Sequence, residues 1–179
     1  VVIVAAIVLG LIVGAINALF MPRGAGPWAA GDTPVVSVRT PGGEVTIVGT
    51  DATNEIRFEP VLNGKFLRVN LSRFSSVGGA NTITDLNPHI NYANTSLPQA
   101  QRELSIGDPR AIVWKADGSK AYITGMGSNN VVMINPSGAR MGSPIEVGEG
   151  PTGLVLHEAA GRAYVLNKFE GTVSTVDLN

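Results

Sequence analysis

Histidine is the side chain in this sequence best suited to bind a metal or transfer a proton, and the chain has two, His89 and His157. A metal site needs three or four converging ligands. His89 lies in a polar stretch and His157 lies beside Glu158 at a predicted strand–turn junction, and neither has a ligand cluster around it. We therefore interpret both as ordinary surface or turn histidines, and we expect no metal and no cofactor.

Other catalytic or covalent chemistry is equally hard to place. Cysteine is absent, which excludes disulfides, thiolate metal sites and covalent c-type haem attachment. No Ser-His-Asp spacing, phosphate-binding loop or GxSxG motif occurs. The sequons at Asn70-Leu71-Ser72 and Asn94-Thr95-Ser96 are interpreted as coincidental in a chain rich in Asn and Ser. The sequence thus predicts a protein that is not an enzyme.

The charge balance excludes one class of partner. Lys and Arg total 13 and Asp and Glu total 14, so no net field favours nucleic acid. We expect partners among proteins and lipids instead.

The apolar start of the chain predicts a membrane helix. No charged residue occurs from Val1 to Pro22, and Asn17 is its strongly polar side chain. About 20 helical residues span the ~30 Å hydrocarbon layer. A signal peptide is the alternative, but its apolar region is usually only about 7–15 residues long. We therefore predict a retained anchor, with Arg23 and Trp28 at the membrane interface.

Small residues recur on one face of this predicted helix. Ala6, Gly10, Gly14 and Ala18 follow one another at intervals of four residues. Small side chains let two helix backbones approach closely within a membrane. The spacing therefore predicts a helix-packing interface, with another subunit or a second copy as the neighbour.

The remaining sequence indicates strands. We predict a linker over residues 23–34, a β-rich segment with a long loop over 35–104, and repeated strands over 105–179, after the membrane helix at 1–22. Short alternating runs follow the linker, and they favour β-structure. These runs are Val35–Thr40, Val45–Thr50, Glu55–Glu59 and Phe66–Leu71. The polar stretch Asn87–Glu103 is interpreted as a surface connection.

The last part of the chain contains an internal repeat. A shift of 42 residues aligns Pro109 with Pro151, Ala121-Tyr122 with Ala163-Tyr164, and Val131 with Val173, without a gap. A period of about 40–45 residues with several short strands is typical of propeller blades. Tyr122 and Tyr164 are predicted to lie in the core.

Each repeat unit predicts the same order of strands. In the first unit the strands are predicted at Ala111–Lys115, Lys120–Thr124 and Val131–Ile134, with an outer strand at Pro144–Val147. Asp117-Gly118 predicts the first turn. The second unit has Ala159-Ala160 in place of that turn.

These stretches resemble a blade of the YVTN β-propeller repeat family, which includes YncE-like proteins and is similar to the haem d1 propeller. The resemblance is clearest from Asp117 to Thr124, from Gly127 to Asn135, and from Ile145 to Gly148. It implies an all-β, partial β-propeller with two clear blades. A degenerate third unit is expected from Asn63 to Leu86.

The number of blades shapes the functional hypotheses. A closed propeller typically has 4–8 blades, so we expect this chain to be the front part of a longer protein, with closure by other chains as the alternative. The leading hypothesis is a single-pass inner-membrane protein whose periplasmic or extracellular propeller is a scaffold or accessory subunit. The resemblance also implies a cofactor-carrying or lactonase-like enzyme with its site in further blades. A pilin-like filament subunit is the third alternative.

Overall fold

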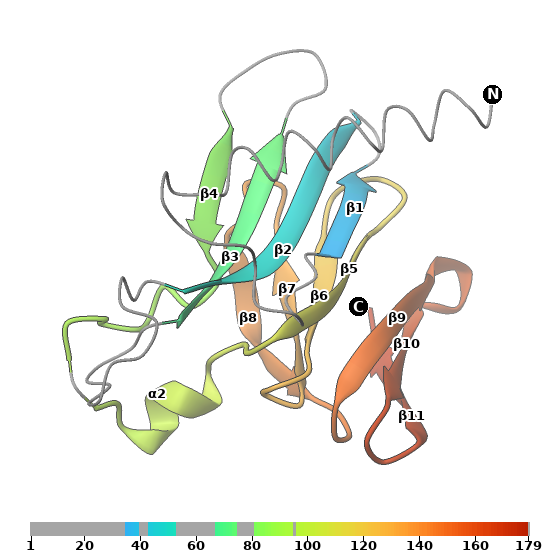
Figure 1. Ribbon diagram of the computed structural model, residues 1–179. Helices are drawn as coiled ribbons and strands as arrows, with labels where there is room; N and C mark the ends of the chain where they lie inside the picture. The colour runs from blue at the N-terminus through green and yellow to red at the C-terminus, as the bar shows by residue number, and fades with distance from the viewer. Residues whose placement is uncertain (1–34, 40–42, 53–66, 75–80, 95, 179) are drawn as a thin grey trace. The chain divides into compact units, whose positions relative to one another are not determined.

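The computed structural model describes residues 35–39, 43–52, 67–74, 81–94 and 96–178. Residues 33–179 form one compact unit. Its described part contains eleven strands, a short α-helix and one 3-10 turn (Figure 1). The all-β class predicted from the sequence is therefore confirmed for this part, and its strands form three antiparallel sheets. The predicted membrane helix lies outside the described residues.

The first sheet contains four strands in sequential order, β1 to β4. They are β1 (Val35–Arg39), β2 (Glu44–Ala52), β3 (Leu67–Phe74) and β4 (Thr82–Asp85). Three of the predicted alternating runs thus lie in strands. The fourth, Glu55–Glu59, lies outside the described residues. The predicted degenerate third unit contributes β3 and β4 to this sheet.

The second sheet has the predicted four-stranded antiparallel form, in the order β5-β6-β7-β8. Its strands are β5 (Pro109–Trp114), β6 (Ala121–Gly125), β7 (Asn130–Ile134) and β8 (Arg140–Glu146). The outer strand begins four residues before the predicted Pro144. The Asn135 side chain causes this early start, because its Oδ1 accepts the backbone N–H groups of Ser137 and Ala139 and so closes a tight turn directly after β7.

The third sheet repeats the first three strands of the second. It contains β9 (Pro151–His157), β10 (Arg162–Asn167) and β11 (Thr172–Asp177), with β10 in the centre. The 3-10 turn η1 (Glu158–Ala160) replaces the Asp-Gly turn of the second sheet. Gly161 follows it with φ of 63°, a left-handed conformation that glycine adopts without steric cost.

The polar connection between the first and second sheets differs in part from the prediction. It contains a five-residue helix, α2 (Gln99–Glu103). The backbone carbonyl groups of Leu86, where the connection begins, and of Leu104, directly after α2, both accept hydrogen bonds from Nη1 of Arg140, at 3.3 and 2.6 Å. Burial of this guanidinium lowers the pKa of Arg140. The connection is thereby fastened to the start of β8.

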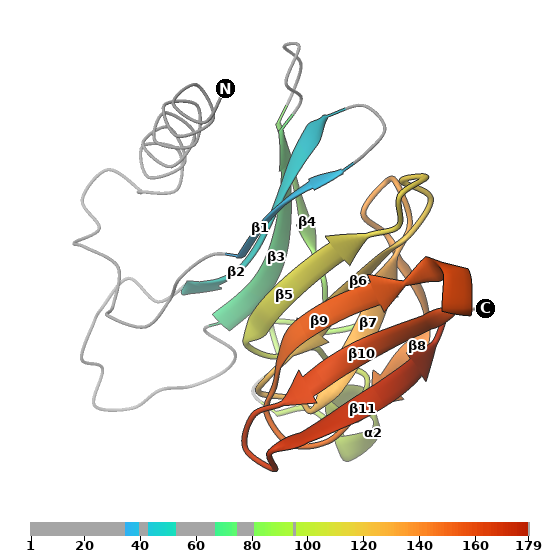
Figure 2. The same ribbon diagram turned by 90° about the vertical axis from the view of Figure 1, so that its right-hand side faces the viewer.

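The second sheet lies between the other two in a propeller-like arrangement. Its first strand, β5, contacts both β1 and β9, the first strands of the neighbouring sheets. The central strand β6 is buried along its whole length. One of its faces contributes Ala121 and Ile123 to a cluster with the first sheet, and the other contributes Tyr122 to a cluster with the third. Figure 2 shows β9, β10 and β11 in front of the second sheet.

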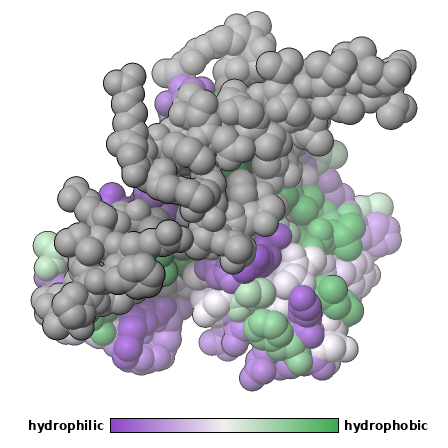
Figure 3. Space-filling view, in the orientation of Figure 1, coloured by the Kyte–Doolittle hydropathy of each residue, from purple (hydrophilic) through white to green (hydrophobic). Residues whose placement is uncertain are grey.

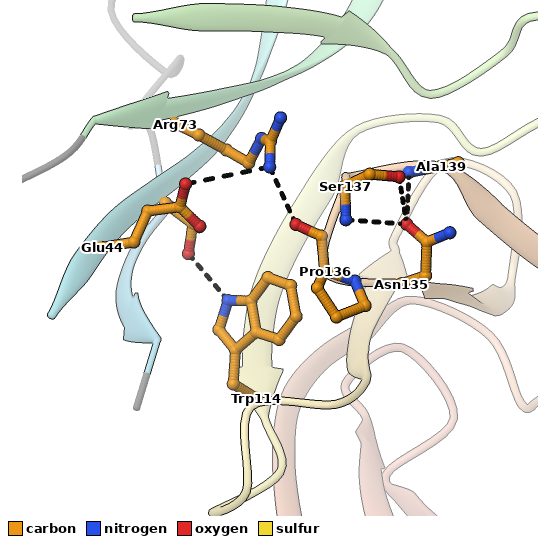
Figure 4. Close-up of polar contacts among 8 residues, drawn as sticks. Glu44, Arg73, Trp114, Asn135, Pro136, Ser137 and Ala139 are labelled. Atoms are coloured by element: carbon orange, nitrogen blue, oxygen red, sulfur yellow. Dashed lines mark hydrogen bonds and ion pairs between the residues drawn. The ribbon is translucent and has the colours of Figure 1, made fainter. Parts of the chain in front are cut away.

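Polar contacts join the first sheet to the second (Figure 4). The indole Nε1–H of Trp114 donates to Oγ1 of Thr46 at 3.0 Å, and both residues are buried. Arg73 lies directly opposite Thr46 on the neighbouring strand β3. Its Nη1 donates to the carbonyl oxygen of Pro136 at 2.8 Å. The same Nη1 lies 3.8 Å from Oε1 of Glu44. The β7–β8 turn is thus held against the first sheet.

Two buried threonines should respond in opposite ways to loss of their hydroxyl groups. Thr46→Val removes the acceptor of the Trp114 indole and should destabilise the protein by about 1–3 kcal/mol. Thr124 is also fully buried, but its Oγ1 has no hydrogen-bond partner among the described residues. Thr124→Val should therefore stabilise by about 1 kcal/mol, because an unpaired buried hydroxyl is costly. Denaturant unfolding of both variants measures the two changes in stability, and an equal loss of stability in both variants would contradict the prediction.

Candidate interaction surface

The two histidines lie far apart in the sequence and differ in their surroundings. Nε2 of half-buried His89 lies 3.0 Å from the carbonyl oxygen of Gln101 and 3.1 Å from Oγ of Ser105. This ring therefore fastens α2 to the start of the connection. His157 is exposed at the end of β9. Among the described residues, no group of three or more His, Cys, Asp or Glu side chains could hold a metal ion.

The predicted membrane-helix interface, Ala6, Gly10, Gly14 and Ala18, lies outside the described residues. The same holds for the predicted interfacial residues Arg23 and Trp28. Within the described ranges, no helix has the length and apolar character needed to cross a membrane.

The most distinctive surface is the outer face of the third sheet, the face turned away from the second sheet. Tyr164 pairs directly with Val155, and Leu166 pairs directly with Val173. Val155, Leu166 and Val173 are exposed to 58%, 47% and 61%. These four neighbouring side chains form what we call the outer apolar face. In Figure 2 this side of the sheet is turned to the viewer, and none of the described elements covers it.

Polar and charged groups border the outer apolar face. Arg162 pairs with His157 on one side and with Asp177 on the other, and all three are exposed. Figure 3, in the orientation of Figure 1, shows hydrophobic and hydrophilic residues mixed at the lower right, where β9 to β11 lie, although the outer apolar face itself is turned sideways in this view. A contiguous apolar patch with a polar rim is typical of a protein-contact site.

The repeat shows what happens to the corresponding face of the second sheet. Val131 and Tyr122, which correspond to Val173 and Tyr164, are both fully buried. They pack against Ala163, Val165 and other residues on the inner face of the third sheet. The two repeats therefore place similar residues on the same face, and among the described elements only the face of the second sheet is covered.

A hydrogen bond accompanies this apolar contact between the second and third sheets. The Tyr122 hydroxyl donates to the carbonyl oxygen of Leu178 at 3.3 Å. Burial raises the pKa of Tyr122, and the nearby carboxylates of Asp177 and Glu158 raise it further. A neutral phenol is therefore built into this contact.

The prediction that both tyrosines lie in the core is correct for Tyr122 and wrong for Tyr164. Tyr164 is half-buried on the outer apolar face. The repeat alone cannot distinguish the two residues, because their strand positions are equivalent. What differs is the presence of a neighbouring sheet. The alternation of residues within β10 shows which face of the sheet Tyr164 lies on, but not whether another sheet covers that face.

No family model and no curated protein matches this chain. Among solved structures, Kuenenia stuttgartiensis hydrazine synthase matches 81% of this chain and 45% of its own chain, with a TM-score of 0.60 and 14% identity. The chain therefore spans less than half of that protein. At this identity the likeness concerns the fold alone, and it supports a propeller-like fold.

Two structures of virginiamycin B lyase from Staphylococcus aureus are more distant. The selenomethionine-substituted form matches 81% of this chain and 41% of its own, with a TM-score of 0.40 and 14% identity. The form with quinupristin matches 86% of this chain and 58% of its own, with a TM-score of 0.34 and 12% identity. Neither adds to the fold assignment.

The two equivalent tyrosines provide a matched test of burial. Tyr122→Phe should cost about 1 kcal/mol through loss of the bond to Leu178, whereas Tyr164→Phe should change stability little. The raised pKa of Tyr122 means that its stabilisation is complete below the ordinary tyrosine pKa of 10.0 and is lost as pH rises above it. Chemical denaturation at neutral pH and at pH above 10 checks both effects. Tyr122→Phe should lose less stability than the parent at alkaline pH, and an identical loss would contradict the assignment.

Proposed function

We propose that this chain is a membrane-anchored, extracytoplasmic scaffold or accessory subunit that binds partner proteins through a propeller-like β-domain. The observation that supports it best is the outer apolar face. Its three exposed apolar residues, Val155, Leu166 and Val173, lie side by side on a well-formed sheet. Aliphatic side chains gain about 1.5–3 kcal/mol each when they are fully transferred from water to a protein contact.

The family assignment within this proposal is that the second and third sheets are YVTN-type repeats. Its support is the gap-free offset of 42 residues together with the same succession of three antiparallel strands in each sheet. The role assigned to these sheets is binding, and we propose no catalytic step for them.

The anchor within this proposal is the charge-free run from Val1 to Pro22. Its length matches the thickness of the hydrocarbon layer. The ridge of Ala6, Gly10, Gly14 and Ala18 then packs against a helix of another subunit in the same membrane. Arg23 and Trp28 lie at the membrane surface, and the β-domain lies on the periplasmic or extracellular side.

Membrane extraction tests the anchor. The full chain, produced in bacterial membranes, should stay in the pellet after washes with alkaline carbonate and with high salt, and detergent should release it. A form that begins at residue 33 should instead appear in the soluble fraction, because it lacks the apolar run. Release of the full chain by carbonate alone would refute the membrane anchor.

Helix association tests the small-residue ridge separately. Gly10→Leu with Gly14→Leu should weaken co-purification with other membrane subunits or self-association at least severalfold, because bulky side chains keep two helix backbones apart. Ala5→Leu with Ala15→Leu introduces the same bulk away from the ridge and serves as the matched control. Equal association of parent and ridge variant would show that the spacing is accidental.

A further inference from the structure

We propose that the peptide bond between Asp108 and Pro109 is a latent self-cleavage site, in which the Asp108 carboxyl group is the nucleophile and Arg110 restrains it. The bond lies where the connection that contains α2 enters β5 (Figure 1). The reaction occurs once, within the chain itself, and has no external substrate. It is independent of the membrane anchor and of partner binding, since its groups all belong to this corner of the fold.

The backbone of Asp108 is strained. Its φ is 47°, which is uncommon for a residue with a side chain, and a residue that precedes proline is also steered toward extended conformations. The corresponding residue 42 positions later is Gly150, which has a φ of 67° and no Cβ to oppose it. Asp108 therefore holds a conformation for which the other repeat uses glycine. Strain of this kind is concentrated at reactive sites.

The carbonyl group of Asp108 is already polarised. Its oxygen accepts the backbone N–H of Met126 at 2.9 Å, and a fixed donor there stabilises the negative charge that develops when a nucleophile attacks the carbonyl carbon. The carbonyl oxygen of Gly150 accepts the N–H of Lys168 in the same way. What distinguishes the first site from the second is thus the side-chain carboxyl group, a known type of covalent nucleophile in proteins.

The proposed reaction needs only water as a co-reactant. An oxygen of the protonated Asp108 carboxyl group bonds to the backbone carbonyl carbon of the same residue, and the bond from that carbon to the nitrogen of Pro109 breaks. The carboxyl proton moves to this nitrogen, which leaves as a secondary amine. One water molecule then opens the five-membered cyclic anhydride on Asp108 to two carboxyl groups. Water has access, because the Asp108 side chain is 36% exposed.

Arg110 is a positioning residue that delays this reaction. Its Nη2 donates to Oδ2 of Asp108 at 2.8 Å. This charge-assisted bond holds the carboxylate oxygen, and it must break before the carboxyl group can take up a proton and attack. The corresponding residue in the other repeat, Thr152, carries no charge. The ion pair therefore accounts for a chain that is stored intact although its backbone is strained.

The two products should remain together after cleavage. Hydrogen bonds that cross the cut connect the first sheet and the connection to the second sheet. They include the bond from Trp114 to Thr46 and the bond from Nδ2 of Asn130 to the carbonyl oxygen of Ser105, at 3.0 and 2.9 Å. Cleavage should thus yield a nicked β-domain, and its two fragments should separate under denaturing conditions.

Fragment analysis of the full chain in detergent tests the proposal. The protein is incubated with protease inhibitors in mildly acidic buffer, in which part of the carboxyl groups is protonated. The parent should slowly release fragments 1–108 and 109–179, identified by intact mass and by an amino-terminal sequence that begins at Pro109. Arg110→Ala should cleave about fivefold faster, as expected for loss of a partly exposed ion pair. Arg110→Lys keeps the cation and should stay close to the parent rate.

Two controls separate the fold from ordinary chemistry. Asp108→Gly should release no fragments, and it should fold normally because Gly150 has the same backbone conformation. Arg110→Ala unfolded in urea should cleave severalfold more slowly than the same variant when folded, because unfolding removes both the backbone strain and the Met126 donor. Cleavage should also be independent of protein concentration, since nucleophile and carbonyl carbon belong to one residue.

The second repeat offers a gain-of-function test. Gly150→Asp introduces the carboxyl group there, but a Cβ at this position would meet the Phe169 ring at 2.5 Å. The residue that corresponds to Phe169 in the first repeat is Gly127. Gly150→Asp with Phe169→Gly therefore reproduces the first site without its restraining arginine. This variant should be cut between residues 150 and 151, and faster than the parent is cut after Asp108.

The proposal is overturned if Arg110→Ala releases no fragments, or if it cleaves equally fast when folded and in urea, because the fold then contributes nothing. A cut at another bond, or a rate that rises with protein concentration, would assign the fragments to a contaminating protease. An intact bond between residues 150 and 151 in the double variant would show that this conformation and a carboxyl group do not suffice.

Discussion

A β-sheet that is apolar on both faces must be covered on both faces, and the described structure depends on this constraint. The second sheet shows it most clearly, because every residue of its central strand β6 is buried. Ala121 and Ile123 require the first sheet as their cover, and Tyr122 requires the third. No sheet in this arrangement is therefore a complete folding unit, since each obtains part of its core from a neighbour.

Polar contacts determine how the neighbouring sheets align. The hydrogen bonds from Trp114 to Thr46 and from Arg73 to Pro136 connect residues far apart in the sequence and fix the second sheet against the first. The Tyr122–Leu178 bond does the same between the second and third. Hydrophobic burial is non-directional, whereas a buried donor must meet one acceptor at a defined distance. The apolar clusters thus favour stacking, and the hydrogen bonds select one alignment.

The sequence predicts the second and third sheets well because their strands recur at a fixed offset. Their turns carry local signals, such as Asp117-Gly118, that do not depend on distant contacts. The early start of β8 and the short helix α2 were missed, since each is fixed by side-chain bonds, those of Asn135 and Arg140, that alternation does not encode. Tyr164 was misplaced for a related reason: periodicity assigns a residue to a face, and only the neighbouring element decides whether that face is covered. For the candidate surface, the repeat aligned Tyr164 and Val173 with residues of the second sheet, but it did not indicate that they lie on an uncovered face.

The strands of each sheet follow one another directly in the chain, from β1 to β4, from β5 to β8 and from β9 to β11. Strand pairing within a sheet therefore joins segments that are neighbours in the sequence, and such local contacts favour rapid folding. During synthesis, the strands of the first sheet can pair before the second sheet has left the ribosome, but the core of the first sheet is complete only when the second sheet packs against it. The connectivity thus favours assembly in the order of the sequence, with each sheet completing the core of the sheet before it.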